Sequence, residues 1–252
     1  MNQPEVAVVT GACRGMGLAI AAQLARDGCR VYGIDVLGEE LRASFAPLVD
    51  EGLDLCALPL DLRDTAAIAA LPDRLGQDYP HLRVLVNNAA ISPKRDGLKV
   101  GFLELTLDDW NLVMSVNLTG AFLMSQICLP PMLEAGYGRI VNNSSVGGKT
   151  VTGGAVATYN TSKAGLLGLT RVLAFEVAAR GVTVNAICPG RIDTPMAREA
   201  VASTNASLLQ RTPVGRFGTS QEIADLVAFL ASRKAGFITG AAFDINGGLA
   251  MV

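Results

Sequence analysis

The amino-acid sequence predicts an α/β domain in which a doubly wound, seven-stranded and mainly parallel sheet carries helices on both faces. The first observation is that short segments rich in Val, Ile and Leu alternate with longer amphipathic segments along the whole chain. The second is that the short segments are apolar almost throughout, as in strands buried on both faces. The third is that the 252 residues contain no low-complexity linker, repeat or break in composition. We therefore expect a single domain spanning residues 1–252.

The elements follow one another in a regular order. We expect strands at Val6–Thr10, Arg30–Asp35, Leu53–Leu60, Leu82–Asn87, Gly138–Ser144, Val182–Cys188 and Ala242–Ile245. We expect helices at Met16–Asp27, Leu37–Glu51, Thr65–Gln77, Leu107–Ala135, Ala157–Arg180 and Ser220–Ala231. Two stretches are too long for simple connections: Ile91–Thr106, and Arg191–Gly218 with a short helical segment at Ala197–Leu209. Both follow the carboxyl ends of strands, where ligands bind in this architecture, so we interpret residues 191–218 as a substrate lid.

The composition argues against several classes of function. The net charge is −2, which provides no general basic field for nucleic acid. No apolar run approaches the ~18 residues that a membrane span needs, and the N-terminus lacks the basic segment of a signal peptide. Five scattered cysteines without a Cys-x-x-Cys pair indicate reduced thiols, and the single His81 disfavours histidine-based metal sites. We expect a cytoplasmic protein that binds neither nucleic acid nor membrane and needs no metal.

A glycine-rich turn joins the first strand to the first helix. It spans Thr10–Gly17 with the sequence TGACRGMG, and its three glycines are Gly11, Gly15 and Gly17. Glycines permit a tight turn and let a pyrophosphate approach the helix N-terminus, where free N–H groups and the helix dipole favour an anion. A glycine loop alone is a weak signal, but here Asp35 closes the second strand, where an acidic residue contacts the ribose of a dinucleotide. The turn and the acid together predict a dinucleotide site.

Two charged residues bear on which dinucleotide is bound. The carboxylate of Asp35 accepts hydrogen bonds from ribose hydroxyls and repels a 2′-phosphate, whereas Arg14 in the glycine turn could pair with that phosphate. Like charges at about 4 Å cost on the order of 4 kcal/mol at moderate dielectric. An exposed ion pair returns only about 0–1 kcal/mol. We therefore expect NAD rather than NADP.

Tyr159 and Lys163 stand four residues apart at the start of the predicted helix Ala157–Arg180, so both side chains lie on one face. A tyrosine that acts as an acid/base near pH ~7 needs its pKa lowered by about 3 units, or roughly 4 kcal/mol. One positive charge at about 4 Å with an effective dielectric near 20 supplies about that much. The pair is thus adequate for proton transfer to or from an alcohol or ketone oxygen, although the same spacing also occurs by chance on surface helices.

These motifs occur with several others in a fixed order, and together they resemble the short-chain dehydrogenases/reductases over nearly the whole chain. The motifs are Thr10–Gly17, Asn87-Asn88-Ala89-Ala90 (with Ala90 in place of the usual glycine), Asn117, Ser145, Tyr159-x-x-x-Lys163, Pro189-Gly190, Gly215–Gly218, Thr239-Gly240 and Gly247-Gly248. The resemblance implies a fold of the Rossmann type and an oxidoreductase that uses a nicotinamide dinucleotide.

The resemblance also implies catalytic roles for four residues. Tyr159 would be the acid/base, and Lys163 would lower its pKa and bind the nicotinamide ribose. Ser145 would hold the substrate oxygen as charge develops there, and the backbone of Asn117 would hold a water that connects Lys163 to solvent. We choose Ser145 over the neighbouring Ser144 because its separation from Tyr159 is closer to that usual in the family.

The implied cofactor contacts run from the adenine to the nicotinamide. Asp61 with Leu62 would contact the adenine ring, the alternative for Asp61 being a helix N-cap. The backbone of Ile192 and the hydroxyl of Thr194 would hold the nicotinamide carboxamide. The other implied contacts are Gly11, Arg14, Gly15, Met16, Gly17, Asp35, Asn88, Ala89, Tyr159, Lys163, Pro189 and Gly190.

Three functions remain open at this stage. The leading hypothesis is an NAD-dependent dehydrogenase of a secondary alcohol of the polyol, sugar or hydroxy acid type. The second is a 3-oxoacyl thioester reductase, whose usual NADPH fits Asp35 badly. The third is a dinucleotide-binding regulator without activity, which the intact Ser145, Tyr159 and Lys163 argue against.

The charge of the substrate and the assembly are open as well. The cations near the expected mouth of the site are Lys94, Arg95, Lys99, Lys149 and Arg191. Either they are merely solvated, or some of them favour an anionic substrate such as a sugar acid, a sulfonate or an acyl-carrier thioester. The helices Leu107–Ala135 and Ala157–Arg180 carry more apolar residues than one covering face requires, as in family members that associate through them. We expect a homotetramer, with a dimer as the alternative.

Overall fold

A computed structural model describes residues 3–92, 95, 98–151, 157–198 and 202–251. Its centre is one sheet with the strand order β3-β2-β1-β4-β5-β6-β7, in which every neighbouring pair is parallel. The strands are β1 (Val6–Thr10), β2 (Arg30–Asp35), β3 (Leu55–Pro59), β4 (Leu82–Asn87), β5 (Gly138–Asn143), β6 (Val182–Pro189) and β7 (Ala242–Ile245). The predicted fold class is confirmed, and the boundaries of the predicted strands differ by at most two residues.

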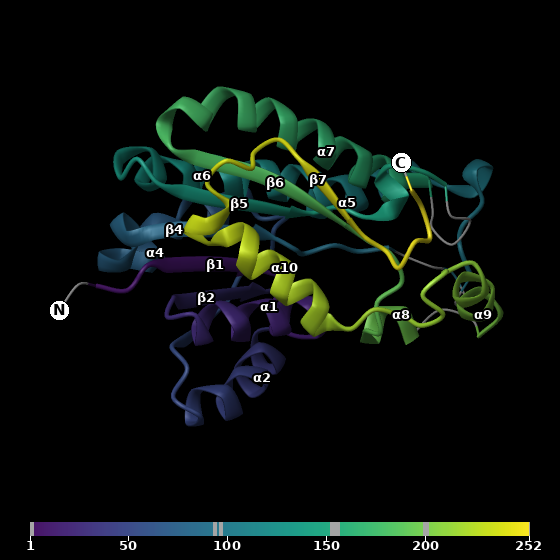
Figure 1. The fold of residues 1–252 in the computed structure, drawn as a ribbon, viewed down its shortest axis with the longest axis horizontal. Coiled ribbons are helices and arrows are strands. Elements are labelled where there is room, and N and C mark those ends of the chain that lie inside the picture. Colours follow the sequence, from purple (N-terminus) through teal and green to yellow (C-terminus); the bar gives the residue numbers. More distant parts are fainter. Residues whose placement is uncertain (1–2, 93–94, 96–97, 152–156, 199–201, 252) are drawn as a thin grey trace.

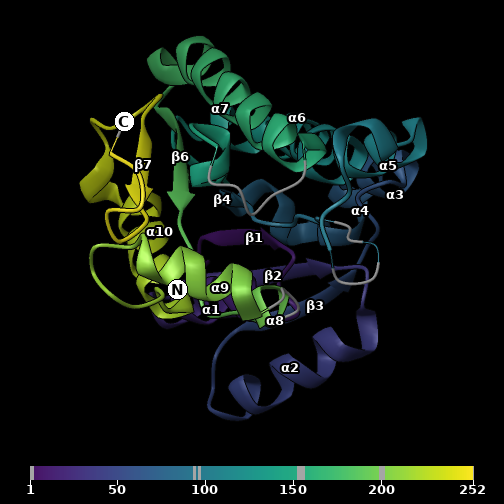
Figure 2. The ribbon, with the colours of Figure 1, turned by 90° about the vertical axis from the view of Figure 1, so that its right-hand side faces the viewer.

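Helices cover both faces of this sheet. One face is covered by α1 (Gly15–Arg26), α2 (Gly38–Asp50) and α10 (Ser220–Ala231), and α10 crosses in front of the strands in Figure 1. The other face is covered by α5 (Leu107–Met114), α6 (Gly120–Glu134) and α7 (Ala157–Val177), which lie at the top of the view in Figure 2. The shorter helices are α3 (Thr65–Ala69), α4 (Leu71–Leu75), α8 (Pro195–Arg198) and α9 (Ala202–Gln210).

The two faces have separate hydrophobic cores because successive side chains of a strand point to opposite sides. On the central strand β1, Ala7 and Val9 pack into the core beneath α1 and α10. Val6 and Val8 pack into the core beneath α6 and α7. All four are completely buried, which explains why the strand is apolar at every position.

Two predicted helices are interrupted. The segment predicted as Thr65–Gln77 forms α3 and α4, with Ala70 between them, and Pro72 occupies the first turn of α4 because its missing N–H is tolerated only there. The segment predicted as Leu107–Ala135 contains a π-helical turn at Ser115–Thr119 between α5 and α6. Such turns are rare and occur frequently at functional sites.

The sequence-based expectation that no apolar run approaches the length of a membrane span does not hold for the helical stretch Leu107–Glu134. Among the described residues, it is the one helix long and apolar enough to cross a membrane by length and composition. Helices in the hydrophobic core of a soluble protein pass the same test. In this helix Met124, Cys128 and Met132 are fully buried against the sheet. Asn117 is buried within the same stretch and is hydrogen-bonded to neighbouring segments.

The carboxyl ends of the strands form one edge of the molecule. Figure 2 looks onto this edge, with α8 and α9 in front of it. The predicted helical segment Ala197–Leu209 corresponds to the end of α8 and most of α9, and its residues 199–201 lie outside the described residues. The connection 191–218 therefore crosses the edge at which ligands bind in open α/β sheets.

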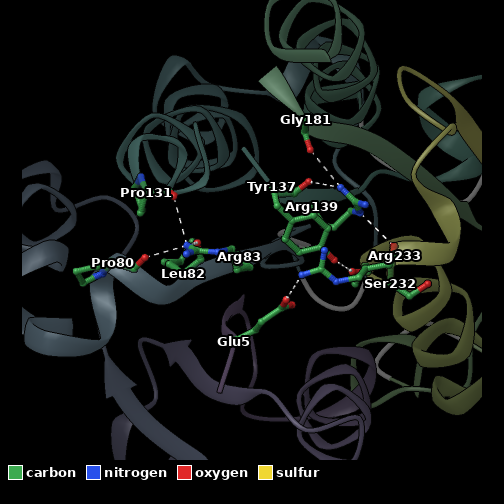
Figure 3. A network of polar contacts seen from close by, with 12 residues as sticks. Glu5, Pro80, Leu82, Arg83, Pro131, Tyr137, Arg139, Gly181, Ser232 and Arg233 are labelled. Carbon is green, nitrogen blue, oxygen red and sulfur yellow. Dashed lines mark hydrogen bonds and ion pairs between the residues drawn. The ribbon is translucent and has the colours of Figure 1, made fainter. Parts of the chain in front are cut away.

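A buried arginine lies at the opposite edge of the sheet, where the strands begin (Figure 3). Arg139 on β5 is only 4% exposed, and its Nε donates to the carbonyl of Ser232 at the end of α10, 3.1 Å away. Its guanidinium lies 4.3 Å from the centre of the Tyr137 ring, and that of Arg233 lies 4.1 Å from the same ring. A cation at the carboxyl end of a helix interacts favourably with the helix dipole, so Arg139 fastens α10 to the sheet.

Candidate active site

A cleft of about 450 Å³ opens at the carboxyl edge of the sheet. Every residue expected to contact the cofactor lines it, and so do Ser145, Tyr159 and Lys163. Asn117 is the exception among the expected site residues. Sequence reasoning did not single out Arg63 or Asn143, which line the cleft as well.

The glycine turn is shaped by contacts that larger residues could not make. Gly11 and Gly15 have φ of 66° and 58°, a region that residues with side chains rarely adopt. A Cβ on Gly17 would lie 1.9 Å from the carbonyl oxygen of Gly11. Asn88 supports the turn from the end of β4, since its Nδ2 donates to the carbonyls of Thr10 and Gly11 at 2.9 and 3.1 Å. The first turn of α1 thus offers its N–H groups beside a narrow backbone cradle, which fits a pyrophosphate.

Asp35 is held rigidly at the end of β2. Its Oδ2 accepts from the backbone N–H of Cys13, and its Oδ1 accepts from that of Leu37, both at 3.1 Å. The carboxylate is therefore fixed beside the glycine turn, where the ribose of a dinucleotide lies in this type of fold.

Asp61 forms an ion pair with Arg63. Arg63 forms hydrogen bonds to both of its carboxylate oxygens, the shortest of them 2.6 Å from Nη2 to Oδ2, and these bonds lower the pKa of Asp61. Asp61 is not the N-cap of the following helix. That position is taken by Asp64, whose side chain accepts from the N–H of Ala67 at 2.9 Å. An adenine ring in this part of the cleft would meet the Asp61–Arg63 pair rather than an isolated carboxylate.

Tyr159 and Ser145 meet at the other end of the cleft. Ser145 follows β5 by two residues, and its hydroxyl accepts from the N–H of Gly147 at 3.0 Å. Burial raises the pKa of Tyr159, while a hydrogen bond with Ser145 and the charge of Arg191 act in the opposite direction. The phenol is therefore a proton donor at neutral pH, as reduction of a ketone requires.

Lys163 is buried behind this pair. It is only 2% exposed, its Nζ donates to the carbonyl of Asn143 at 2.5 Å, and Nζ lies 5.7 Å from the centre of the Tyr159 ring. Burial lowers the pKa of Lys163 to about 8. That Lys163 lowers the pKa of Tyr159 stays a prediction, and the charge of Arg191 is a further influence in the same direction.

Asn117 lies in the π-helical turn and ties three segments together. Its Oδ1 accepts from the N–H of Ile91 at 2.8 Å, and its Nδ2 donates to the Ile91 carbonyl and to Ser162 Oγ, both at 3.0 Å. The side chain thus joins the end of α5 to the loop after β4 and to α7. Its position is behind the cleft wall, next to the helix that carries Tyr159 and Lys163.

The segment after β6 forms the wall nearest to Tyr159. A Cβ on Gly190 would lie 2.8 Å from Asn246 Cα, so the chain passes close to the segment after β7. Ile192 forms a parallel bridge with Gly218, and the Thr194 hydroxyl accepts from the N–H of Ala197 at 3.2 Å. Pro189, Gly190, Ile192 and Thr194 follow one another along the cleft.

The cations considered for substrate binding separate into two groups. Lys149 points toward β7, with Nζ 2.7 Å from Asp244 Oδ2, and Arg95 pairs with Asp109 at 2.6 Å. Lys99 is exposed, and Lys94 lies outside the described residues. Arg191, in contrast, is half-buried and lines the cleft.

Comparison with known proteins agrees with this geometry. A family model described as enoyl-(acyl carrier protein) reductase matches residues 11–250. The chain belongs to the short-chain dehydrogenases/reductases. Like other members of that family, it is an oxidoreductase that acts on an alcohol or keto group with a nicotinamide dinucleotide.

Two curated relatives of this short-chain dehydrogenase/reductase are 3-oxoacyl-[acyl-carrier-protein] reductases. The protein from Escherichia coli is 39% identical over 248 residues, and the alignment covers 98% of each chain. The protein from Pseudomonas aeruginosa is 40% identical over 249 residues, covering 99% of this chain and 98% of the other.

Two solved structures are similar as well. A 3-oxoacyl-[acyl-carrier protein] reductase with bound NAD from Brucella melitensis has a TM-score of 0.91 at 35% identity, covering 100% of this chain and 93% of the other. A putative gluconate dehydrogenase from Agrobacterium tumefaciens has a TM-score of 0.90 at 31% identity, covering 98% of this chain and 97% of the other.

Proposed function

We propose that this protein interconverts 3-oxoacyl and 3-hydroxyacyl thioesters with NAD(H). The observation that supports the proposal is the cleft, whose lining includes Ser145 and Tyr159 together with the glycine turn and Asp35. Identities of 39–40% over nearly full length to 3-oxoacyl-[acyl-carrier-protein] reductases support the acyl substrate. The comparisons thus favour the second of the three sequence-based hypotheses over the polyol dehydrogenase.

Each residue of the proposed site has a definite task in the reduction. The bound nicotinamide supplies the hydride that reaches the substrate carbonyl carbon. Ser145 donates a hydrogen bond to the carbonyl oxygen, and Tyr159 delivers the proton that converts this oxygen to a hydroxyl. Lys163 lies next to Tyr159 and binds the nicotinamide ribose in this proposal, while Asn117 holds the water path through which Tyr159 regains its proton. Oxidation of the alcohol runs the same steps in reverse.

The preference for NAD(H) rests on Asp35. Its carboxylate is fixed by the N–H groups of Cys13 and Leu37 and cannot turn away from a 2′-phosphate without losing both bonds. A negative charge at about 4 Å opposes that phosphate by on the order of 4 kcal/mol at moderate dielectric, and exposure to solvent reduces this figure. The NAD-bound Brucella reductase supports the combination of an acyl substrate with NAD.

The absorbance of NADH and NADPH at 340 nm tests the proposal. Acetoacetyl-coenzyme A and acetoacetyl-N-acetylcysteamine should both be reduced with NADH, and NADPH should be at least tenfold less effective. Asp35→Asn keeps the size of the side chain and removes its charge, so it should raise the activity with NADPH. If neither nucleotide reduces either thioester, the acyl substrate is wrong; if Asp35→Asn leaves the nucleotide preference unchanged, the assignment of NAD is wrong.

A second candidate is a dehydrogenase of sugar acids. The similarity to a putative gluconate dehydrogenase and the presence of Arg191 at the Tyr159 end of the cleft favour it. Turnover of d-gluconate with NAD, in the absence of activity on the two thioesters, would establish this candidate instead.

We also propose that the protein is a homotetramer. Phe122 on α6 and Val172 and Phe175 on α7 are 45%, 59% and 90% exposed, which is unusual for large apolar side chains on two adjacent helices. Light scattering coupled to size exclusion should give four times the chain mass of 26.3 kDa. A dimer is the alternative outcome, and a monomer would refute the proposal.

A further inference from the structure

We infer that Arg191 is a specificity-determining residue that binds a carboxylate of the substrate, a few bonds away from the carbon that is oxidised or reduced. This inference rests on the alcohol–ketone chemistry proposed above but not on which of the two candidate substrates is correct. The shared chemistry is a carboxylate near the carbinol, either in a free hydroxy acid or at the end of an acyl chain.

The backbone at Arg191 is fixed on both sides. Its carbonyl accepts from the N–H of Gly218 at 3.0 Å, and the N–H of Asp193 donates to the Gly218 carbonyl at 2.9 Å. Ile192 completes this short parallel bridge. The start of the 191–218 connection is thus joined to its end, just before α10, so the Cα of Arg191 has a defined position directly after β6.

The side chain is positioned in the cleft rather than on the outer surface. Arg191 is half-buried and lines the same cleft as Ser145 and Tyr159. Its Nη2 donates to the carbonyl of Ala197 on α8 at 2.6 Å, which directs one arm of the guanidinium along the lid segment. The charge of Arg191 also lowers the pKa of the Tyr159 phenol.

Three other cations near the cleft lie elsewhere, and Lys163 is buried behind Tyr159 with its Nζ on the Asn143 carbonyl. Arg14 and Arg63 line the part of the cleft that contains Asp35 and Asp61, where the nucleotide is expected. Lys149 is directed to Asp244 on β7. Arg191 is therefore the cation of these four that stands at the reacting end.

A guanidinium suits a carboxylate particularly well. Its planar fork can donate two parallel hydrogen bonds, and such charge-assisted bonds are stronger than those between neutral groups. An uncharged polyol or a simple thioester has no negative charge and no pair of carboxylate oxygens for the guanidinium to bind. The similarity to a putative gluconate dehydrogenase is consistent with a substrate that carries a carboxylate.

The test uses pairs of compounds in which one member carries a carboxylate and the other carries a neutral group at the same position. d-Gluconate and d-glucitol share a carbon chain, as do 3-oxobutanoate and its ethyl ester. The measured quantity is the ratio of kcat/KM between the anionic and the neutral member of each pair. Arg191→Gln should lower this ratio about 10- to 100-fold, mainly through KM, as expected for a lost hydrogen bond to a charged group. Arg191→Lys should retain part of the preference for the anionic member of each pair.

Lys149→Gln is the matched control, because it removes a cation that faces away from the cleft. Lys149→Gln should change kcat/KM for both members of a pair by the same factor. An equal loss on both members in Arg191→Gln would overturn the inference while leaving the proposed function intact. If wild type turns over none of the four compounds, calorimetric titration with d-gluconate and 3-oxobutanoate in the presence of NAD decides. Binding that Arg191→Gln weakens at least tenfold supports the inference. Absence of binding by wild type, together with no selective loss in Arg191→Gln on the carboxylate-bearing thioester described next, overturns it.

An acyl chain ending in a carboxylate is distinguished from a free hydroxy acid with a third pair. Glutaryl-type 3-oxoacyl thioesters of N-acetylcysteamine carry a terminal carboxylate, and their methyl esters do not. Sensitivity to Arg191→Gln with this pair alone would assign the carboxylate to the acyl chain. Sensitivity with d-gluconate or 3-oxobutanoate would assign it to a free acid.

Discussion

Burial of the Lys163 ammonium should make the stability of the protein depend on pH in a specific direction. Lys163 is 2% exposed, and burial lowers its pKa from 10.5 to about 8. Below pH ~8 the folded and unfolded chains both hold the proton, so the full cost of burying the charge is present. Between pH ~8 and ~10.5 the unfolded chain holds more protons than the folded chain, and the free energy of unfolding rises with pH. A shift of 2.5 units corresponds to about 3 kcal/mol.

Lys163→Met removes this dependence, because methionine has a similar length and no charge. The difference in unfolding free energy between wild type and Lys163→Met should increase by about 2–3 kcal/mol from pH 7 to pH 10. The hydrogen bond to the Asn143 carbonyl is lost in the variant at every pH, so it adds the same amount to the difference in unfolding free energy throughout. Cysteines and tyrosines whose pKa values are raised by burial act in the opposite direction, but they are the same in both proteins.

Urea unfolding followed by circular dichroism at pH 7, 8, 9 and 10, with a reductant and without nucleotide, measures this difference. Lys99→Met serves as the control for exchanging a lysine for methionine, because Lys99 is exposed. A difference between wild type and Lys163→Met that is flat, or that decreases as the pH rises, would show that the lysine is not buried as a cation with a lowered pKa.

Three further predictions concern single substitutions. Tyr159→Phe should lower kcat at least about 100-fold, the range of general acid catalysis, with NADH affinity by fluorescence titration unchanged; wild-type turnover would exclude Tyr159 as the acid. Gly17→Ala should abolish NADH binding, because its Cβ would lie 1.9 Å from the Gly11 carbonyl oxygen, whereas Gly168→Ala, with nothing within 4 Å, should raise the unfolding free energy by about 0.5–1 kcal/mol. Arg139→Met should lower the unfolding free energy by about 1–3 kcal/mol, since buried carbonyls lose their donor, while kcat stays within twofold of wild type; an unchanged urea midpoint would contradict this.

The sheet could be predicted from the sequence because its strands are apolar along their whole length. Four of the seven predicted strands, including Val6–Thr10 and Leu82–Asn87, have the observed bounds. The break at Ala70 could have been found from Pro72, which is tolerated in the first turn of a helix but not in its interior. The π-helical turn could not, because it coincides with hydrogen bonds from Asn117 to residues 26 and 45 positions away.

The arrangement of charged side chains was the least predictable part of the site. Lys149 and Arg191 look equivalent in the sequence, and their environments differ because β7 brings Asp244 next to Lys149 whereas Arg191 lines the cleft. Asp61 is the residue that the sequence suggests as an N-cap, but Arg63 binds its carboxylate and Asp64 caps the helix instead. Partners such as these are chosen by tertiary contacts, whereas the glycine turn is set by local backbone geometry and can be read directly.

The carbonyl partners of Arg139 have a consequence for the protein in acid. Main-chain oxygens of Gly138, Gly181 and Ser232 keep their lone pairs at any pH, while carboxylates become protonated and release their cations. Acidification therefore loosens carboxylate contacts such as that of Asp61 with Arg63 at the cleft, while the bonds from Arg139 to these carbonyls remain. In amide exchange in acid, β5 and the end of α10 should accordingly be among the last segments to open.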